Sequence, residues 1–191
     1  MKKLSFKAVF LPAISLFVIC VIIALLLGLT NELTKAAIAD NAVLNEQQAM
    51  QAVCPEGETF EKAEIVPEEK GEAHFALDNE GIITGYAVSV TEKGYGGDIE
   101  IMVGISYKGE ITGVEILSIN ETPGLGMNAK GEEFRGQFKG YPPQGGFSAK
   151  DSEEMKRNVD ALTGATITSE AVSKAVNKAL DIYSVIKEAG F

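Results

Sequence analysis

A short stretch near the C-terminus, Asp160 to Ile167, combines hydroxyl side chains with a small and flexible turn. It reads Asp-Ala-Leu-Thr-Gly-Ala-Thr-Ile and leads into Thr168 and a long amphipathic run. The first turn of a helix has unpaired N–H groups and the positive end of the helix dipole, so it favours a phosphate. The Thr166 hydroxyl is therefore placed to carry a phosphoryl group, either bound or esterified. The alternative is an ordinary turn with a threonine N-cap, because Ser and Thr are preferred there.

A second stretch, from Glu121 to Gly126, reads Glu-Thr-Pro-Gly-Leu-Gly and follows a predicted strand. Pro123 restricts the backbone, whereas Gly124 and Gly126 allow a positive φ or the close approach of another group. Leu125 is the only large apolar side chain between the glycines, so this loop could lie against a flat ring. An ordinary strand-ending turn is the alternative interpretation.

Both stretches match motifs of one known family. Asp160 to Ser169 resembles the flavinylation motif of the FMN-binding domain family, Asp-x-x-Ser/Thr-Gly-Ala-Thr-x-Thr-Ser, and Thr163 stands where Ser is commoner. Glu121 to Gly126 matches the family's second motif at every position. The resemblance runs from the N-terminal apolar segment to about Ala189. It is strongest to the G subunits of Rnf-type ion-translocating electron transport complexes, and next to the C subunits of sodium-translocating NADH:quinone reductases.

The resemblance implies a covalent FMN that relays electrons in a membrane complex, between ferredoxin and NAD in the Rnf type. FMN would be joined by a phosphoester to Thr166. Partners would be the other membrane subunits of the complex and a separate flavin transferase, since nothing here resembles an enzyme that cleaves FAD. The subunit would not be catalytic alone. The remaining predicted cofactor-binding residues are Thr163, Gly164, Ala165, Thr168, Glu121, Thr122, Gly124, Leu125 and Gly126.

Three other functions are compatible with the sequence. A C subunit of the quinone reductase is typically longer than 191 residues. A stand-alone FMN electron carrier of the cell envelope would purify without other membrane subunits. A non-redox, membrane-anchored scaffold would use the segment 163–166 only as a helix cap, and it would be colourless.

The N-terminal segment is typical of a membrane anchor. Ala8 to Thr30 holds 23 residues without a charge, and a spanning helix needs roughly 20. A cleaved signal peptide is the alternative, although its apolar core usually has only about 7–15 residues. Lys2, Lys3 and Lys7 precede the segment, and basic residues favour the cytoplasmic side. We therefore expect a single-pass protein of the cell membrane with its main domain outside the cytoplasm.

Composition excludes several functions. The net charge of −10 argues against binding nucleic acid, whose phosphates would repel this chain. Two cysteines and the single His74 do not make a metal site, and without a Cys-x-x-Cys pair we expect no iron–sulfur cluster. Cys20 lies in the apolar segment and Cys54 beyond it, so no disulfide is expected. Cys54 is predicted to be a small buried apolar residue.

Periodicity predicts an α+β protein, with an antiparallel sheet flanked by helices and one N-terminal transmembrane helix. The predicted regions are an anchor over residues 1–30, a juxtamembrane helix over 31–55 and an extracytoplasmic FMN-binding domain over 56–191. Within the last region we expect strands at 60–66, 82–92, 99–107 and 111–119, a short helix at 132–138, a loop at 139–150, and a final helix from about Ser169 to Ala189.

Overall fold

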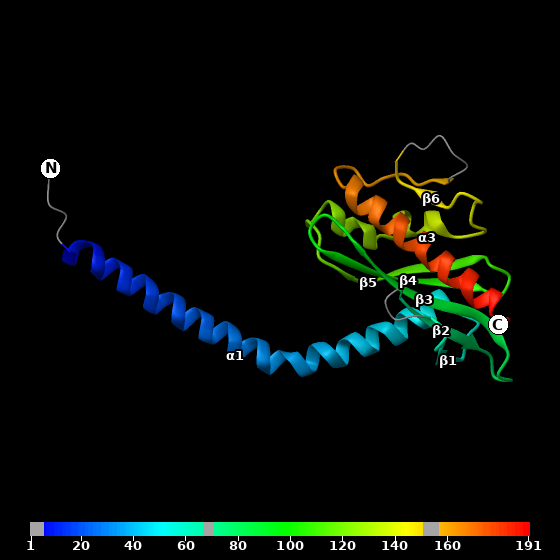
Figure 1. Cartoon of the computed structure of the whole chain (residues 1–191), viewed down its shortest axis with the longest axis horizontal. Helices are drawn as coiled ribbons and strands as arrows, with labels where there is room; N and C mark the ends of the chain where they lie inside the picture. Colours follow the sequence, from blue (N-terminus) through cyan, green and yellow to red (C-terminus); the bar gives the residue numbers. More distant parts are fainter. Residues whose placement is uncertain (1–5, 67–70, 151–156) are drawn as a thin grey trace. The chain divides into compact units, whose positions relative to one another are not determined.

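This computed structural model of the chain describes residues 6–66, 71–150 and 157–191 (Figure 1). Two units are distinguished, Met1–Leu44 and Asn45–Phe191. In chain order the elements are α1 (Phe6–Val53), β1 (Thr59–Lys62), β2 (Glu72–Leu77), β3 (Ile83–Lys93), β4 (Asp98–Ser106), β5 (Ile111–Ile119), η1 (Gly126–Lys130), α2 (Glu132–Arg135), η2 (Gly136–Phe138), β6 (Phe147–Ser148), β7 (Arg157–Asn158) and α3 (Thr166–Glu188). The α+β class predicted from the sequence is confirmed.

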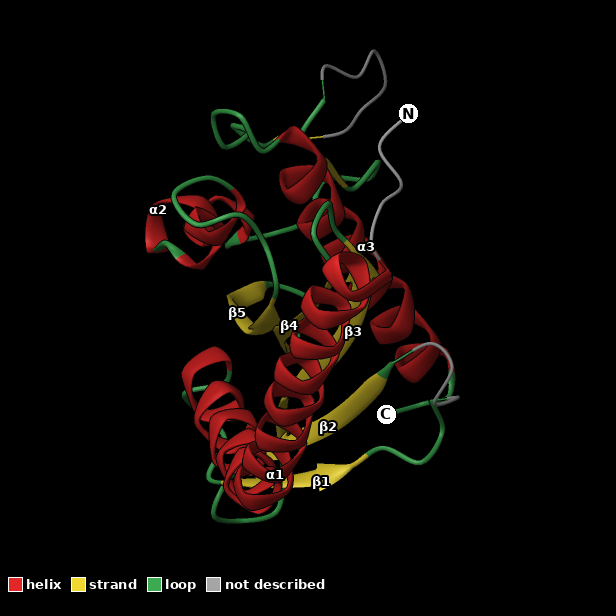
Figure 2. Cartoon of the chain, turned by 90° about the vertical axis from the view of Figure 1, so that its left-hand side faces the viewer, coloured by secondary structure: helices red, strands yellow, loops and turns green. Residues whose placement is uncertain are grey.

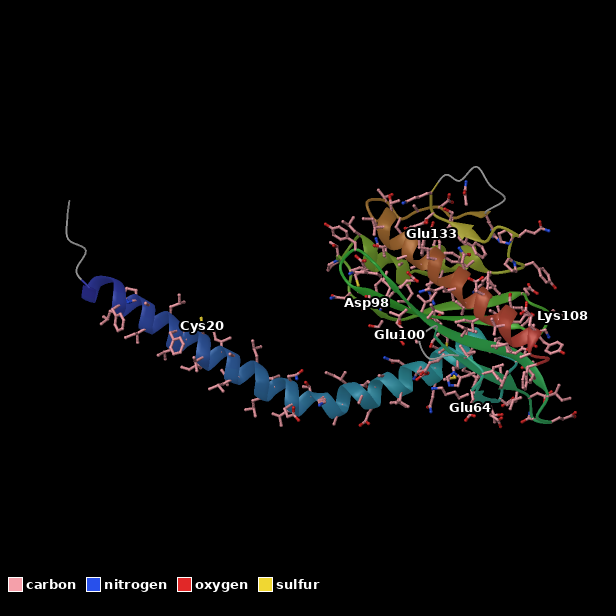
Figure 3. The ribbon with its side chains drawn as sticks, in the orientation of Figure 1. Cys20, Glu64, Asp98, Glu100, Lys108 and Glu133 are labelled. Carbon is pink, nitrogen blue, oxygen red and sulfur yellow. The ribbon has the colours of Figure 1, made fainter. Side chains whose placement is uncertain are left out.

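The first unit consists of the greater part of α1. The anchor and the juxtamembrane helix, which were expected to meet at residues 30 and 31, form one continuous helix that ends at Val53 rather than at residue 55 and tolerates Pro12 near its start. Every side chain from residue 10 to residue 45 is exposed, including Cys20 (Figure 3). By length and composition α1 can cross a membrane, as the sequence predicts. Of the lysines that suggest its orientation, Lys2 and Lys3 lie outside the described residues.

The second unit is built on a five-stranded antiparallel sheet in the order β1-β2-β3-β4-β5. Side chains alternate between the two faces of a strand, so Tyr86, Val88 and Val90 of β3 share one face. That face packs against α3, whose buried stripe includes Val172 and Val176 (Figures 1 and 2). The sheet therefore holds α3 lengthwise and fixes the position of its N-terminus.

The opposite face of the sheet receives the C-terminal end of α1. Gly104 and Gly113 are cross-strand partners, and a side chain at either position would meet the Val53 backbone. The Thr112 hydroxyl donates a hydrogen bond to the Val53 carbonyl oxygen. Two neighbouring glycines thus form a shallow seat for the end of the helix. The buried residues of this second cluster are Ala49, Met50, Val53, Cys54, Ala76, Ala87 and Met102.

Cys54 is buried next to this seat, as the sequence predicts. Its Sγ lies 3.5 Å from the Tyr86 carbonyl oxygen, to which the thiol donates a weak hydrogen bond. Burial raises the pKa of the thiol to about 12. Because the thiolate is the reactive form, Cys54 is expected to be inert in the folded protein.

Gly104→Ala is expected to lower the stability of the domain by about 1–3 kcal/mol, because the new Cβ would collide with the Val53 carbonyl oxygen. Urea unfolding of the full chain in detergent measures the change. Gly136→Ala is the matched control: the nearest atom to its Cβ is 3.9 Å away, so the change should stay within about 0.5 kcal/mol. Equal midpoints of urea unfolding for the two variants would show that the end of α1 does not pack closely against Gly104.

Several elements differ from the sequence-based expectation. The strand expected at 60–66 is the shorter β1, which ends at Lys62. The helix expected at 132–138 is α2 followed by the 3-10 turn η2. The loop expected at 139–150 contains β6, which pairs in parallel with β7. The final helix begins at Thr166 rather than Ser169, because the Ala165 carbonyl accepts hydrogen bonds from both the N–H and the hydroxyl of Ser169. Ser169 is fully buried inside the first turn and is not its start.

Candidate functional site

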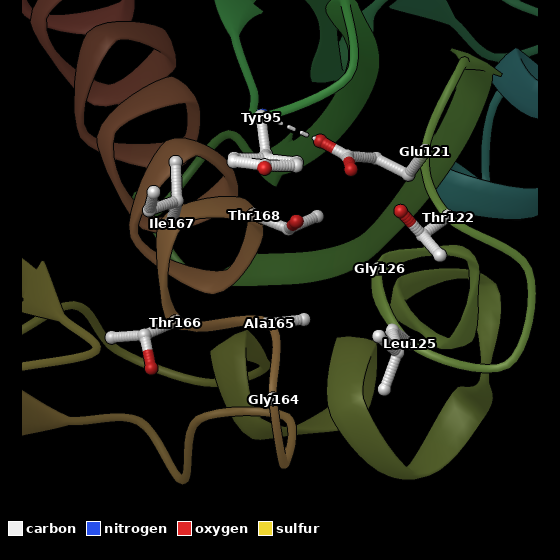
Figure 4. A pocket seen from close by; sticks show the side chains of 10 residues that line it. All are labelled: Tyr95, Glu121, Thr122, Leu125, Gly126, Gly164, Ala165, Thr166, Ile167 and Thr168. Carbon is white, nitrogen blue, oxygen red and sulfur yellow. Dashed lines mark hydrogen bonds between the residues drawn. The ribbon is translucent and has the colours of Figure 1, made fainter.

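A cleft of about 560 Å³ lies where the start of α3 faces two loops at one end of the sheet (Figure 4). Its volume is within the range of small-molecule sites, about 300–1,000 Å³. One loop, residues 94–97, connects β3 to β4, and the other, residues 120–125, follows β5. The ten residues that line the cleft are Tyr95, Glu121, Thr122, Leu125, Gly126, Gly164, Ala165, Thr166, Ile167 and Thr168.

Strand register brings these segments together. Ile99 near the start of β4 pairs with Ile119 at the end of β5, so the two loops leave the same end of the sheet. The turn before α3 reaches the second loop directly. Gly164 has a φ of +74°, and a Cβ at this position would lie 3.1 Å from Leu125 Cδ2. The two motifs are separated in sequence and adjacent in the fold.

Glu121 ties the two loops to each other. Its side chain is only 8% exposed, and Oε1 accepts hydrogen bonds from the backbone N–H groups of Tyr95 (2.6 Å) and Gly96 (3.2 Å). Glycines surround the carboxylate: a Cβ at Gly94 would collide with Oε1, and a Cβ at Gly126 would lie 2.9 Å from Oε2. The hydrogen bonds of the carboxylate are therefore made to the protein backbone.

The start of α3 is suited to an anion. Ala165 is the N-cap residue and, among the residues that the structure describes, no side chain caps the helix or places a carboxylate in its first turn. The threonine N-cap considered from the sequence is therefore absent. Thr166 is exposed as the first helical residue, whereas Thr168 is buried beneath it. Unpaired N–H groups beside an exposed hydroxyl fit a phosphate or a phosphoester.

Eight of the ten predicted site residues line the cleft, and Thr163 and Gly124 do not. Thr163 faces a neighbouring cavity of about 860 Å³, because the turn at Gly164 separates it from Thr166. Gly124 is exposed, and its φ of +77° serves the tight turn of the loop.

The sequence-based prediction omitted two residues of the cleft, Tyr95 and Ile167. Tyr95 lies in the glycine-rich turn between β3 and β4, which falls in the gap between the strands expected at 82–92 and 99–107. An aromatic residue between glycines could have indicated it. Ile167 stands at a variable position of the motif at residues 160–169, and it follows Thr166 directly.

Comparison with known proteins identifies the domain. The sequence model of the FMN-binding domain family matches residues 94–181, a range that includes the whole lining of the cleft. The fold and the cleft therefore define an FMN-binding domain.

Two relatives with high coverage give the particular family. The G subunit of the Na(+)-translocating ferredoxin:NAD(+) oxidoreductase complex of Acetobacterium woodii is 35% identical over 95% of this chain and 94% of its own length. The G subunit of the proton-translocating complex of Clostridium ljungdahlii is 33% identical over 92% of this chain and 91% of its own. This chain belongs to the family of G subunits of ion-translocating oxidoreductase complexes, which confirms the resemblance found in the motifs. The names of these relatives differ in the translocated ion, so membership of the family leaves the ion open.

A solved structure with a related architecture is the C subunit of the Na(+)-translocating NADH-quinone reductase from Parabacteroides distasonis. It is 23% identical, with a TM-score of 0.49 over 60% of this chain and 61% of that chain.

Proposed function

We propose that this chain is the electron-carrying G subunit of a membrane-bound, Rnf-type ferredoxin:NAD oxidoreductase complex, and that it holds FMN as a phosphoester of Thr166. The observation that carries the proposal is the cleft itself, in which the uncapped start of α3 meets the loop from Glu121 to Gly126. FMN, when bound, supplies electron transfer. The chain would fix the position of the FMN and provide the surroundings of its ring.

The chain's own residues divide this task. The Thr166 oxygen makes the covalent link, and the unpaired N–H groups of the first turn face the phosphate charge. None of the ten residues lining the described cleft is basic, so the helix start is the local source of positive potential. Leu125 and Ile167 offer apolar walls, which exclude water from a bound ring. Ala165 and Gly164 keep the approach to Thr166 uncrowded.

The proposal extends to the location and the partners of the chain. Residues 1–30 would form the cytoplasmic tip and the membrane anchor, 31–55 the juxtamembrane helix, and 56–191 the FMN-binding domain outside the cytoplasm. Other membrane subunits of the complex would exchange electrons with the flavin. A flavin transferase would install it, because the acidic chain carries no FAD-cleaving motif of its own.

The test of this function is flavin that remains on the denatured chain. The full chain is co-expressed with a flavin transferase, purified in mild detergent and run on a denaturing gel read by flavin fluorescence. We expect a fluorescent band and co-purification with the other subunits of an Rnf-type complex. Co-purification with quinone reductase subunits would favour that complex instead, and a flavin band without companions would favour a stand-alone carrier. A dark band would favour the scaffold and overturn the proposal.

The proposed orientation of the chain in the membrane predicts which cysteines a membrane-impermeant reagent can reach. Buried Cys54 cannot report it, so both native cysteines are replaced (Cys20→Ser, Cys54→Ala) and Lys108→Cys is added in the exposed turn between β4 and β5 (Figure 3). A membrane-impermeant maleimide is expected to label this cysteine in intact cells. Ser5→Cys is the control on the other side, and it should label only after permeabilisation. The reverse pattern would place the domain in the cytoplasm.

A further inference from the structure

The cleft has an apolar rim made of three exposed side chains from three different segments. Tyr95 is 73% exposed, Ile167 54% and Leu125 41%. They belong to the β3–β4 loop, to the first turn of α3 and to the loop after β5. Single exposed apolar residues are ordinary, whereas several around one cleft mark a ligand-binding surface.

Tyr95 differs from the other two because its backbone is fixed by a buried charge. Its N–H donates to Glu121 Oε1 at 2.6 Å, and the N–H of Gly96 donates to the same oxygen. Hydrogen bonds to a charged group are about twice as strong as those between neutral groups. These bonds therefore hold the backbone of the loop in place, and the Tyr95 ring lies at the opposite end of the cleft from Leu125 (Figure 4).

We propose that Tyr95 is the aromatic contact of the flavin ring and that Glu121 is its positioning residue, an assignment that rests on the proposed function. Tyr95 is the only aromatic residue among the ten that line the described cleft. Aromatic rings attract one another when offset-stacked or edge-to-face, at centroid distances of about 4.5–7 Å. The two hydrogen bonds accepted by Glu121 both come from the backbone of the Tyr95 loop, so the glutamate positions the loop that carries Tyr95.

Native flavin fluorescence tests the contact, because a phenol ring touching the isoalloxazine quenches its emission. The chain is loaded with covalent flavin, and native emission is divided by the in-gel signal after denaturation. We expect a low ratio for the wild type and a several-fold rise for Tyr95→Ala. Tyr95→Phe should brighten as well while keeping the wild-type absorbance bands, since Phe stacks without donating an electron. Tyr141→Ala removes a tyrosine that is 64% exposed outside the cleft, and it should match the wild type.

The role of Glu121 is tested by rescue and by a double variant. Glu121→Ala should brighten the flavin as Tyr95→Ala does, whereas Glu121→Gln retains an acceptor oxygen and should stay close to the wild type. The double variant Glu121→Ala/Tyr95→Ala should be no brighter than Tyr95→Ala, because the two changes remove the same contact between Tyr95 and the flavin. Additive brightening would overturn the positioning role.

Failure of this inference is distinguishable from failure of the proposed function. A fluorescent gel band with unchanged native emission and absorbance in Tyr95→Ala would overturn the Tyr95 contact and leave the FMN assignment intact. A dark wild-type gel band would overturn the FMN assignment and the Tyr95 contact together.

Discussion

Thr166→Ala is expected to abolish the flavin that survives denaturation while leaving the domain folded. The substitution removes the one oxygen that the proposed phosphoester requires. Thr166 is exposed at the first position of α3 and no side-chain capping bond is lost, so the stability should change by no more than about 0.5 kcal/mol. Denaturing gels read by flavin fluorescence, beside thermal unfolding of the same samples, measure both effects.

The neighbouring hydroxyls provide matched controls for this experiment. Thr163→Ala changes an exposed residue that faces the adjoining cavity, and it should retain covalent flavin. Thr168 is 1% exposed, so Thr168→Val is the better control there because it keeps the shape of the buried side chain. Thr166→Ser restores a hydroxyl and should restore at least part of the band. A bright Thr166→Ala band would place the attachment elsewhere.

The sequence predicted the central strands well because their side chains alternate. The ranges 82–92, 99–107 and 111–119 differ from β3, β4 and β5 by at most one residue at each end. The helical periodicity of apolar residues does not show where α3 begins, because its first two residues, Thr166 and Ile167, are both exposed. What fixes that helix end is the pair of hydrogen bonds between Ser169 and Ala165, which no periodicity shows.

The sequence predicted the residues of the site that lie in the two motifs, apart from Ile167, and it did not predict Tyr95, which lies outside them. Each motif gives the residues within one loop, and the turns at Gly124 and Gly164 decide which of these face the cleft. Tyr95 stands 26 residues before Glu121, so its place depends on the register of two hairpins. The same register explains why the glycines around Glu121 look like ordinary turn residues in the sequence: the carboxylate that fills the space between Gly94 and Gly126 is visible only in the fold.

Gly126→Val is expected to change the flavin spectrum more than any other glycine substitution in the second motif. The new Cβ would lie 2.8 Å from Thr168 Oγ1 and 2.9 Å from Glu121 Cβ, and both partners are buried. Overpacking of this kind costs about 1–3 kcal/mol, so the domain should stay largely folded. Displacing Glu121 and Thr168 would disturb both walls of the cleft. We expect shifted or weakened flavin absorbance, with covalent flavin still present on the gel because Thr166 is intact.

Gly124→Ala separates this local effect from a general loss of stability. Its φ of +77° makes any side chain costly by about 1–2 kcal/mol, yet a Cβ there meets no atom within 4 Å. The two variants should therefore lose comparable stability in thermal unfolding, and only Gly126→Val should alter the absorbance of the native protein. If Gly126→Val kept the wild-type spectrum and normal electron transfer, the loop from Glu121 to Gly126 would lie away from the flavin. Equal spectral changes in both variants would mean that loosening the loop is sufficient, and that the contact of Gly126 with Glu121 and Thr168 has no special part in shaping the cleft.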